Sequence, residues 1–191
     1  MLERLDVALF LALNGWHASW ADPLQAAISA RWVWLPLYVW LLYTFQRSYG
    51  RRVLWLLGAL ALLVAACDQA SNVLKALTQR PRPCHEPALE GLVHMVRWSC
   101  GGAYGFVSGH AANSMGPALF LHRLLPRGHA ALRASLALYV LAISYSRIYL
   151  GRHYPGDVLG GWLLGAALGL GASLLVQRAL ASRAAPVNSR G

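Results

Sequence analysis

The chain has 191 residues, of which 57% are apolar and only 13% are charged, whereas about 25% of residues are charged in a typical soluble domain. This composition excludes an ordinary soluble domain and indicates a single membrane-embedded domain over residues 1–191. The formal net charge of +10 does not indicate a nucleic-acid partner, because the basic residues lie in short connectors between apolar runs.

Residues 2–20 are expected to form a short amphipathic helix. Polar residues such as Glu3, Asp6, Asn14 and His17 fall on one helical face. The pattern is typical of a helix that lies in the membrane interface, and a short first span is the alternative. The apolar face carries Leu2, Leu5, Leu9, Leu13, Trp16 and Trp20.

Five longer apolar segments follow, at about 24–45, 53–77, 105–125, 132–150 and 157–180. A helix needs about 20 residues to cross the hydrocarbon core, so each segment is long enough to span a bilayer. Because a spanning chain must satisfy its backbone polar groups internally, these segments are expected to be helices. The predicted fold is therefore an all-α integral membrane bundle of about five transmembrane helices plus the N-terminal interfacial, or short sixth, helix.

Arginine-rich connectors set the expected orientation. The connectors 46–52 and 123–133 and the tail from residue 178 each carry three arginines. Short arginine-rich connectors mark the cytoplasmic side, and five spans put all three on that side. The loop 78–104 and the turn 147–157 would then face the periplasm, across a bacterial-type inner membrane. Arginines in these two segments weaken the contrast between the two sides.

Three polar motifs lie at the ends of the predicted spans. They read K-x6-R-P at 75–83, S-G-H at 108–110 and S-R-x5-H-x3-D at 146–157. The first lies at the exit of the second span, the next at the entrance of the third, and the last in the turn before the fifth. All three are therefore expected on the periplasmic face.

These motifs resemble those of the type 2 phosphatidic acid phosphatase superfamily, a group of metal-independent membrane phosphatases. The resemblance covers residues 75–157, with one departure: Val107 stands where the family usually has a proline. That change is expected to affect loop stiffness and not the chemistry. The resemblance implies a hydrolase that acts on a lipid phosphate or diphosphate without a metal or another cofactor.

A phosphoryl group in transfer spreads negative charge over its equatorial oxygens, so fixed cations and N–H donors stabilise it. Arginine can bind phosphate with two parallel hydrogen bonds, and backbone N–H groups at a helix start form an anion site. Taken singly, these cations could equally be charges that snorkel at a membrane boundary. The expected phosphate-binding residues are Lys75, Arg82, Ser108, Gly109 and Arg147.

The resemblance also implies the catalytic roles. His153 would be the nucleophile that forms a phosphohistidine, and Asp157 would accept the other ring N–H and fix the tautomer. His110 would protonate the leaving oxygen and then activate water. Taken alone, either histidine could be a simple interfacial residue and Asp157 a helix N-cap. The joint spacing of the three motifs favours the catalytic interpretation.

Three further residues lie near the motifs. Asp68 shares a helical face with Asn72 and Lys75, and it either supports the site from behind or makes a structural hydrogen bond. Cys84 and Cys100 bracket the loop after the first motif. They would form a disulfide if the loop faces an oxidising periplasm, and two free thiols are the alternative.

The motifs identify a phosphate and carry no information about the lipid that bears it. The compact chain resembles small undecaprenyl diphosphate phosphatases, which makes undecaprenyl diphosphate the leading substrate. Phosphatidylglycerophosphate, phosphatidate and lipid A phosphates are alternatives, as is phosphate transfer to a second lipid. A non-catalytic binding or scaffold protein on the same fold is the alternative of another class. The expected partners are thus the lipid substrate and membrane lipids, with no nucleic acid.

Overall fold

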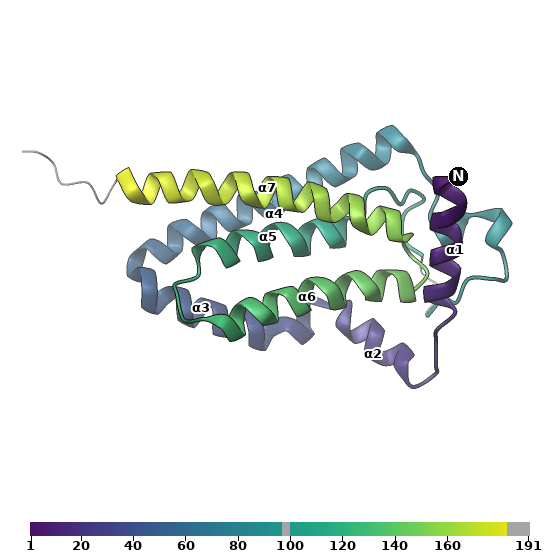
Figure 1. Cartoon of the computed structure of the whole chain (residues 1–191), viewed down its shortest axis with the longest axis horizontal. Coiled ribbons are helices and arrows are strands. Elements are labelled where there is room, and N and C mark those ends of the chain that lie inside the picture. Colours follow the sequence, from purple (N-terminus) through teal and green to yellow (C-terminus); the bar gives the residue numbers. More distant parts are fainter. Residues whose placement is uncertain (97–99, 183–191) are drawn as a thin grey trace, which may run out of the picture.

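The structure is a computed structural model that describes residues 1–96 and 100–182, and within these ranges its regular elements are helices (Figure 1). Four short 3-10 turns connect or extend the α-helices, at Arg31–Trp34, Gly50–Arg52, Pro83–His85 and Pro87–Leu89. The α-helices are α1 (Leu2–Asn14), α2 (Ala21–Ile28), α3 (Leu35–Tyr49), α4 (Val53–Thr78), α5 (Gly109–Leu124), α6 (Ala130–Tyr149) and α7 (Pro155–Ser182).

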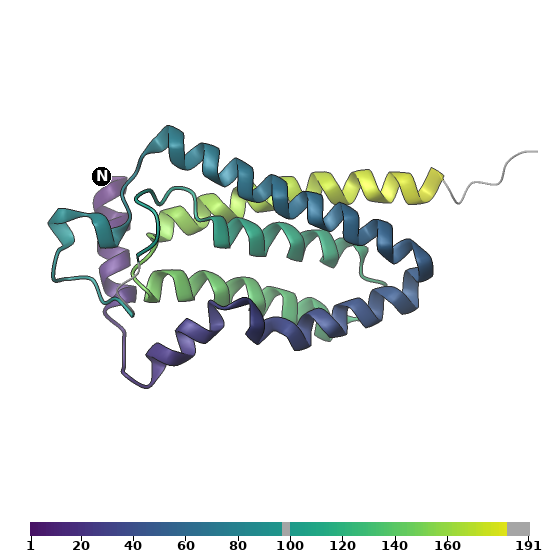
Figure 2. The same cartoon turned by 180° about the vertical axis from the view of Figure 1, so that it is seen from behind.

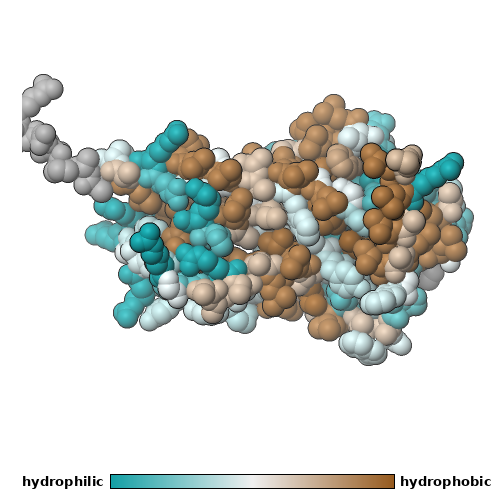
Figure 3. All heavy atoms as spheres, viewed as in Figure 1, coloured by the Kyte–Doolittle hydropathy of each residue, from teal (hydrophilic) through white to brown (hydrophobic). Residues whose placement is uncertain are grey.

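The predicted membrane bundle is confirmed. Three helical stretches of the described chain are long and apolar enough to cross a membrane: 32–78, which contains both α3 and α4, then α6 and α7. Leu62 of α4 and Leu163 of α7 each expose 74% of their surface, which suits a surface that faces lipid. Brown, hydrophobic side chains cover much of the face seen in Figure 3.

The segment expected as one span at 24–45 is broken in the structure. Ala30 is extended (φ −87°, ψ 141°) between α2 and the 3-10 turn that leads into α3. The indole Nε1 of Trp34 donates to the Ile28 carbonyl at 2.9 Å and so satisfies the end of α2. The predicted single helix is therefore wrong here, and α2 is a separate short helix that packs against α6.

Glycines bring α5 and α7 into close contact. Gly161, Gly165 and Gly169 recur every four residues of α7 and lie against the backbone of α5. A Cβ atom at Gly165 would stand only 2.5 Å from the Ala112 carbonyl oxygen, so no larger residue fits there without a shift. This packing sets the start of α5 beside the start of α7, where the Ser108 N–H donates to the Asp157 carbonyl at 2.9 Å.

The connectors separate into two ends of the bundle (Figures 1 and 2). The α3–α4 turn, the α5–α6 turn and the C-terminal end of α7 lie at one end. The segments 79–96 and 100–108, the turn 150–154 and α1 lie at the other. The arginine-rich connectors thus share one end as expected, and the motifs gather at the opposite end. Arg183 and Arg190 of the tail lie outside the described residues.

Helix α1 lies across the motif end of the bundle rather than along it (Figure 1). Its predicted apolar face points outward, with Leu2 80% and Leu5 56% exposed. Part of the opposite face is packed against the protein, where Asn14 is buried and its Nδ2 donates to the carbonyls of Ile148 and Tyr149 at 3.0 and 2.9 Å. This placement agrees with an interfacial helix and not with a sixth span.

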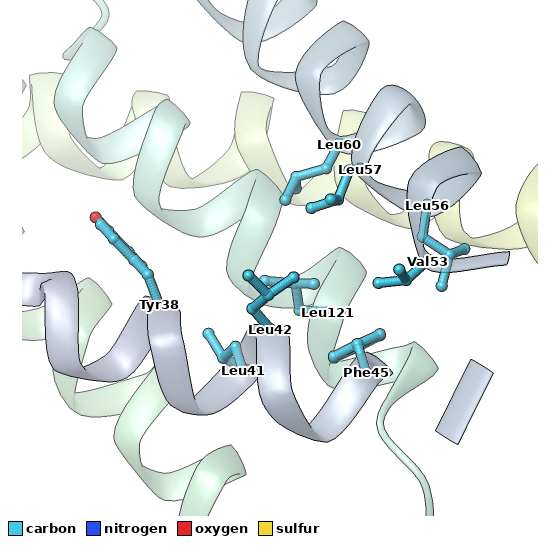
Figure 4. A pocket seen from close by; sticks show the side chains of 9 residues that line it. All are labelled: Tyr38, Leu41, Leu42, Phe45, Val53, Leu56, Leu57, Leu60 and Leu121. Atoms are coloured by element: carbon cyan, nitrogen blue, oxygen red, sulfur yellow. The ribbon is translucent and has the colours of Figure 1, made fainter. Parts of the chain in front are cut away.

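A groove opens between α3 and α4 in the membrane-spanning part of the molecule (Figure 4). Its volume is about 260 Å³, and none of the motif residues lines it. Such an apolar groove suits a surface in contact with lipid tails. Its lining consists of Tyr38, Leu41, Leu42, Phe45, Val53, Leu56, Leu57, Leu60 and Leu121.

Candidate active site

A buried histidine–carboxylate pair lies at the motif end of the bundle. His153, in the turn between α6 and α7, is 2% exposed, and Asp157, in the first turn of α7, is 0% exposed. The His153 Nδ1 atom lies 3.3 Å from Asp157 Oδ2, which also accepts the Tyr154 backbone N–H at 3.0 Å. The spacing of four residues between the two side chains thus produces the expected contact.

Arg80 holds the other oxygen of Asp157, which the sequence patterns did not predict. Its Nη1 donates to Asp157 Oδ1 at 2.8 Å, and its Nη2 donates to Asp6 Oδ2 of α1 at 2.6 Å. The guanidinium also lies over the Tyr154 ring, 4.3 Å from the ring centroid. In the sequence, Arg80 is one of several arginines of its loop, and Asp6 is one of several polar residues of an amphipathic helix.

The three motif cations act on the His153 ring. Burial first, and then the charges of Arg82, Arg147 and Lys75, hold the pKa of His153 well below its usual range. A hydrogen bond with the Gly105 backbone acts in the opposite direction. A Cβ atom at Gly105 would lie within 3.5 Å of both Arg82 Cγ and Asp157 Oδ2, so the first and third motifs meet beside His153.

Arg82 is fixed by the chain that follows it. Its Nε donates to the Tyr104 carbonyl and its Nη1 to the Cys100 carbonyl, both at 3.1 Å. The sulfur atoms of Cys84 and Cys100 are in bonding contact, and their Cα atoms are 6.1 Å apart. The predicted disulfide would therefore close the loop directly behind Arg82.

Arg147 is buried near the end of α6, at 2% exposure. Its Nη1 donates to the Ser29 hydroxyl, in the break between α2 and the 3-10 turn. Within the described part of the chain, its Nε is buried without a hydrogen-bond partner. Since an orphaned buried donor costs free energy, this atom is well suited to donate to a bound phosphate.

The second motif begins α5 beside Lys75. Ser108 caps the helix by accepting the Ala111 N–H at 3.4 Å. A Cβ atom at Gly109 would stand 3.3 Å from Lys75 Nζ, so the ammonium lies against the helix start. Together, the ammonium and the N–H groups at a helix N-terminus form a site for an anion.

His110 occupies the second position of α5 and is exposed. The charges of Arg147, Arg152 and Arg82 act on its ring, and those of Arg147 and Arg82 act on His153 as well. The two histidines therefore lie near the same cations, although one is in α5 and the other in the turn before α7. An exposed imidazole there can reach a substrate that enters from outside the bundle.

Asp68 does not bond directly to Lys75, the lysine of the first motif. The side chain is exposed on α4, and its charge acts on Lys75 through space. The Lys75 ammonium donates instead to Asn72 Oδ1 at 3.4 Å. The expected supporting role of Asp68 stays a prediction that rests on charge alone.

Within the described residues, no group of three or more His, Cys, Asp or Glu side chains could hold a metal ion. The charged groups at the site are instead mainly cations, which attract phosphate oxygens directly. Metal independence stays a prediction, and an activity assay in EDTA tests it.

A bundle of membrane-spanning helices that carries three motif cations, two histidines and a buried carboxylate at one end defines a membrane protein with a cationic site. The chain belongs to the PAP2 superfamily, whose model matches residues 52–181. The predicted family is thereby confirmed.

Comparison with known proteins agrees with this membership. The chain is 36% identical over 167 residues to the lipid A 4'-phosphatase of Bacteroides thetaiotaomicron, covering 86% of this chain and 73% of that protein. It is 38% identical over 119 residues to the phosphatidylglycerophosphatase B of Bacillus subtilis, and the match covers 58% of this chain and 54% of that protein. The fold matches the crystal structure of a transmembrane PAP2-type phosphatidylglycerolphosphate phosphatase from Bacillus subtilis with a TM-score of 0.69. The two are 23% identical, and the match covers 93% of this chain and 87% of the other. The chain is therefore a phosphatase that acts on a lipid phosphate.

Proposed function

We propose that the chain removes a phosphate from a membrane lipid at the periplasmic face of an inner membrane, through a phosphohistidine on His153. The observation that carries this proposal is the buried His153–Asp157 pair among three cations at one end of the bundle. The Asp157 contact occupies Nδ1, so Nε2 is the nitrogen suited to attack phosphorus. The depressed pKa keeps the imidazole neutral, as a nucleophile must be.

The reaction then has two balanced steps. In the first, His153 Nε2 forms a bond to phosphorus, the bond from phosphorus to the lipid oxygen breaks, and His110 gives that oxygen a proton. In the second, His110 takes a proton from water, the water oxygen attacks phosphorus, and the phosphorus–nitrogen bond breaks. Inorganic phosphate and the free lipid alcohol, or the lipid monophosphate from a diphosphate, are the products.

The cations replace the charge that a metal would otherwise supply. Lys75, Arg82 and Arg147 would hold the equatorial oxygens, and the orphaned Nε of Arg147 gains an acceptor when phosphate binds. The Ser108 hydroxyl and the N–H groups around Gly109 would add neutral donors at the start of α5. All of these groups are in place before substrate arrives, which favours electrostatic stabilisation of the transition state.

Lipid A phosphate is the first substrate to test. The relative that aligns with 86% of this chain is named a lipid A 4'-phosphatase, whereas the phosphatidylglycerophosphatase aligns with 58%. This moves the lead away from undecaprenyl diphosphate, which the compact length of the chain suggested. Undecaprenyl diphosphate, phosphatidylglycerophosphate and phosphatidate remain alternatives because the site recognises the phosphate, not the lipid.

A phosphate-release assay on the purified protein tests both the chemistry and the substrate. The four lipids are compared in detergent with EDTA present, and His153→Ala serves as the control for contaminating phosphatases. We expect release from at least one lipid, fastest from lipid A, and none from the variant. Full activity in His153→Ala would refute the nucleophile assignment. A folded wild-type protein inactive on all four lipids would favour a binding or scaffold protein.

A further inference from the structure

A chain of two ion pairs runs from the N-terminal helix to the histidine–carboxylate pair. It joins Asp6 of α1 to Arg80, and Arg80 to Asp157. We propose that Arg80 and Asp6 are positioning residues, which hold Asp157 in the orientation that makes His153 an effective nucleophile. The inference rests on the proposed function, because it takes His153 as the nucleophile. Asp6 lies outside the three motifs, and Arg80 occupies one of the unspecified positions of the first.

The guanidinium of Arg80 is held on several sides. Two different nitrogens bond two different carboxylates, at 2.8 and 2.6 Å, and the group lies over the Tyr154 ring. Only 23% of its side chain is exposed, and Asp6 and Asp157 are 14% and 0% exposed. A planar guanidinium can bridge two carboxylates in one fixed orientation, whereas the single ammonium of a lysine cannot. Arg80 therefore acts as a rigid bridge.

Arg80 is the ion-pair partner that decides where the Asp157 carboxylate points. Oδ1 accepts from Arg80, while Oδ2 faces His153 Nδ1 and the Tyr154 N–H. A completely buried carboxylate that loses its cation either takes up a proton or rotates towards another donor. Either change weakens its hold on the imidazole ring. The phosphate-binding cations are not part of this contact, so the effect should fall on turnover and not on substrate binding.

Asp6 ties this bridge to the start of α7. Its Oδ2 accepts from Arg80, and its Oδ1 accepts the Gly156 N–H at 2.7 Å, one residue before Asp157. A Cβ atom at Gly156 would stand 2.6 Å from Asp6 Oδ2, so the absence of a side chain there makes room for the carboxylate. One carboxylate of α1 thus fixes both the backbone and the cation next to Asp157.

Asp6 lies outside residues 52–181, which match the family model, whereas Arg80 and Gly156 lie within them. One partner of Arg80 therefore comes from a part of the chain that the family model does not include. The other face of α1 is apolar and exposed, as expected for a helix seated in a membrane interface. The seating of α1 therefore contributes to the geometry of the reacting pair. This adds a part of the site that the motifs do not contain.

The test compares steady-state kinetics of Arg80→Gln, Asp6→Asn and the double variant with those of the wild type. Loss of the residue that orients a metal-ligating histidine typically costs about 10- to 100-fold in activity, and we expect a loss of similar size for a nucleophilic histidine. We expect kcat to fall within that range for Arg80→Gln and by about 10-fold for Asp6→Asn, with KM changed by less than about two-fold. Because the two residues act as a unit, the double variant should match Arg80→Gln.

Glu3→Gln and Arg4→Gln are matched controls, since both residues are exposed on α1. Both should keep the wild-type kcat. Asp6→Glu should recover part of the activity that Asp6→Asn loses. If Arg80→Gln does not fold, Asp6→Asn and Gly156→Ala disturb the contacts of Asp6 with Arg80 and Gly156 more mildly. The kcat values of these two variants then test the positioning role.

Three outcomes would overturn the inference: a wild-type kcat in folded Arg80→Gln and Asp6→Asn, losses that multiply in the double variant, or a raised KM with unchanged kcat. His153→Ala, measured in parallel, separates this failure from failure of the proposed function. An inactive His153→Ala beside a fully active Arg80→Gln rejects only the positioning role. An active His153→Ala rejects the proposed nucleophile itself.

Discussion

Gly105 lies so close to Asp157 that a Cβ atom at position 105 would stand 2.7 Å from the carboxylate Oδ2. The same atom would lie 3.5 Å from Cγ of Arg82. The backbone of Gly105 also bonds to the site, because its N–H donates to the Arg80 carbonyl at 2.8 Å and its backbone bonds to His153. A single glycine of the long loop thus packs against the carboxylate that orients the histidine.

Gly105→Ala should therefore impair turnover. The added methyl group must push away the Asp157 carboxylate or the loop, and a shift of about 1 Å can cost roughly 100-fold in rate. We expect kcat to fall at least about 10-fold, measured as phosphate release. Gly102→Ala is the matched control, since a Cβ atom at Gly102 meets nothing within 4 Å. Equal activity of the two variants would contradict the tight contact.

The sequence predicted the helices well where packing agrees with hydrophobicity. Helices α4, α6 and α7 lie within two residues of the segments expected at 53–77, 132–150 and 157–180. The prediction of a single helix at 24–45 was wrong because the break between α2 and α3 depends on contacts made in the folded chain. The Trp34 indole closes α2, and Ser29 in the break bonds to Arg147, more than a hundred residues away. Pro36, in the first turn of α3, is a local sign of a helix start, but the contacts of Trp34 and Ser29 that fix the break have no such sign in the sequence.

The motifs likewise predicted the position of the candidate site but not its supporting residues. Spacing alone placed His153 and Asp157 one helical turn apart, and in the structure the two side chains are in contact. Asp6 and Arg80 could not be predicted, because α1 lies across the bundle end only in the folded chain. The sequence predicted that α1 has one polar and one apolar face. Only the structure shows that part of the polar face packs against the protein.

Close packing of α5 on α7 predicts that Gly165→Ala destabilises the protein. A Cβ atom at Gly165 would meet the Ala112 carbonyl oxygen at 2.5 Å and the Gly116 backbone nitrogen at 2.9 Å. Overpacking of this kind typically costs about 1–3 kcal/mol, so the melting temperature in detergent should fall. Gly171→Ala is the control, because a Cβ atom at Gly171 meets nothing within 4 Å. A melting temperature for Gly165→Ala equal to that of the control would argue against this packing.

The depressed pKa of His153 predicts how activity depends on pH. Burial and the nearby Arg82 and Arg147 charges hold this pKa well below the usual value of about 6.5. The imidazole stays neutral and nucleophilic as the pH falls, so the acid limb of kcat/KM should lie below about pH 6.5. An acid limb centred above about pH 7 would contradict the assignment.

The same shift affects stability. The folded pKa lies below the unfolded value, so the unfolded state binds more protons as the pH falls below about 6.5. The contribution of His153 to stability is therefore present above this pH and is lost as the pH falls towards the folded pKa. His153→Gln removes the titration. Thermal melts between about pH 5 and pH 8 should show a weaker loss of stability at acidic pH for the variant than for the wild type.

The pairing of Cys84 with Cys100 predicts a link between redox state and phosphate binding. Non-reducing peptide mapping should find the two residues joined, and closing a loop of this size stabilises the protein by about 3 kcal/mol in the chain-entropy model. Because Arg82 donates to the Cys100 carbonyl, Cys84→Ser should raise KM several-fold. Cys67→Ala, at a buried free cysteine, should leave KM unchanged. Two alkylatable thiols at positions 84 and 100 in the native protein would exclude the disulfide.

Lys75, the one lysine of the chain, should contribute to binding of the phosphate and of the transition state. Its ammonium lies against the start of α5, where the helix N-terminus favours an anion. Lys75→Gln removes the charge but keeps a side chain of similar length. Orthophosphate and orthovanadate, which mimic the product and the five-coordinate transition state, should both inhibit the variant more weakly.

The two inhibitors separate two contributions of this lysine. The trigonal transition state carries its charge on the equatorial oxygens, so a cation aimed at them stabilises it more than the ground state. The inhibition constant of orthovanadate should therefore rise about 100-fold, and that of orthophosphate less, by about 10-fold. Asn72→Ala leaves the ammonium in place and is the control, because it removes only the 3.4 Å contact to Lys75 Nζ. If Lys75→Gln keeps the wild-type inhibition constant for both anions, the lysine does not contact the phosphate, and its position at the start of α5 serves the packing of the helix.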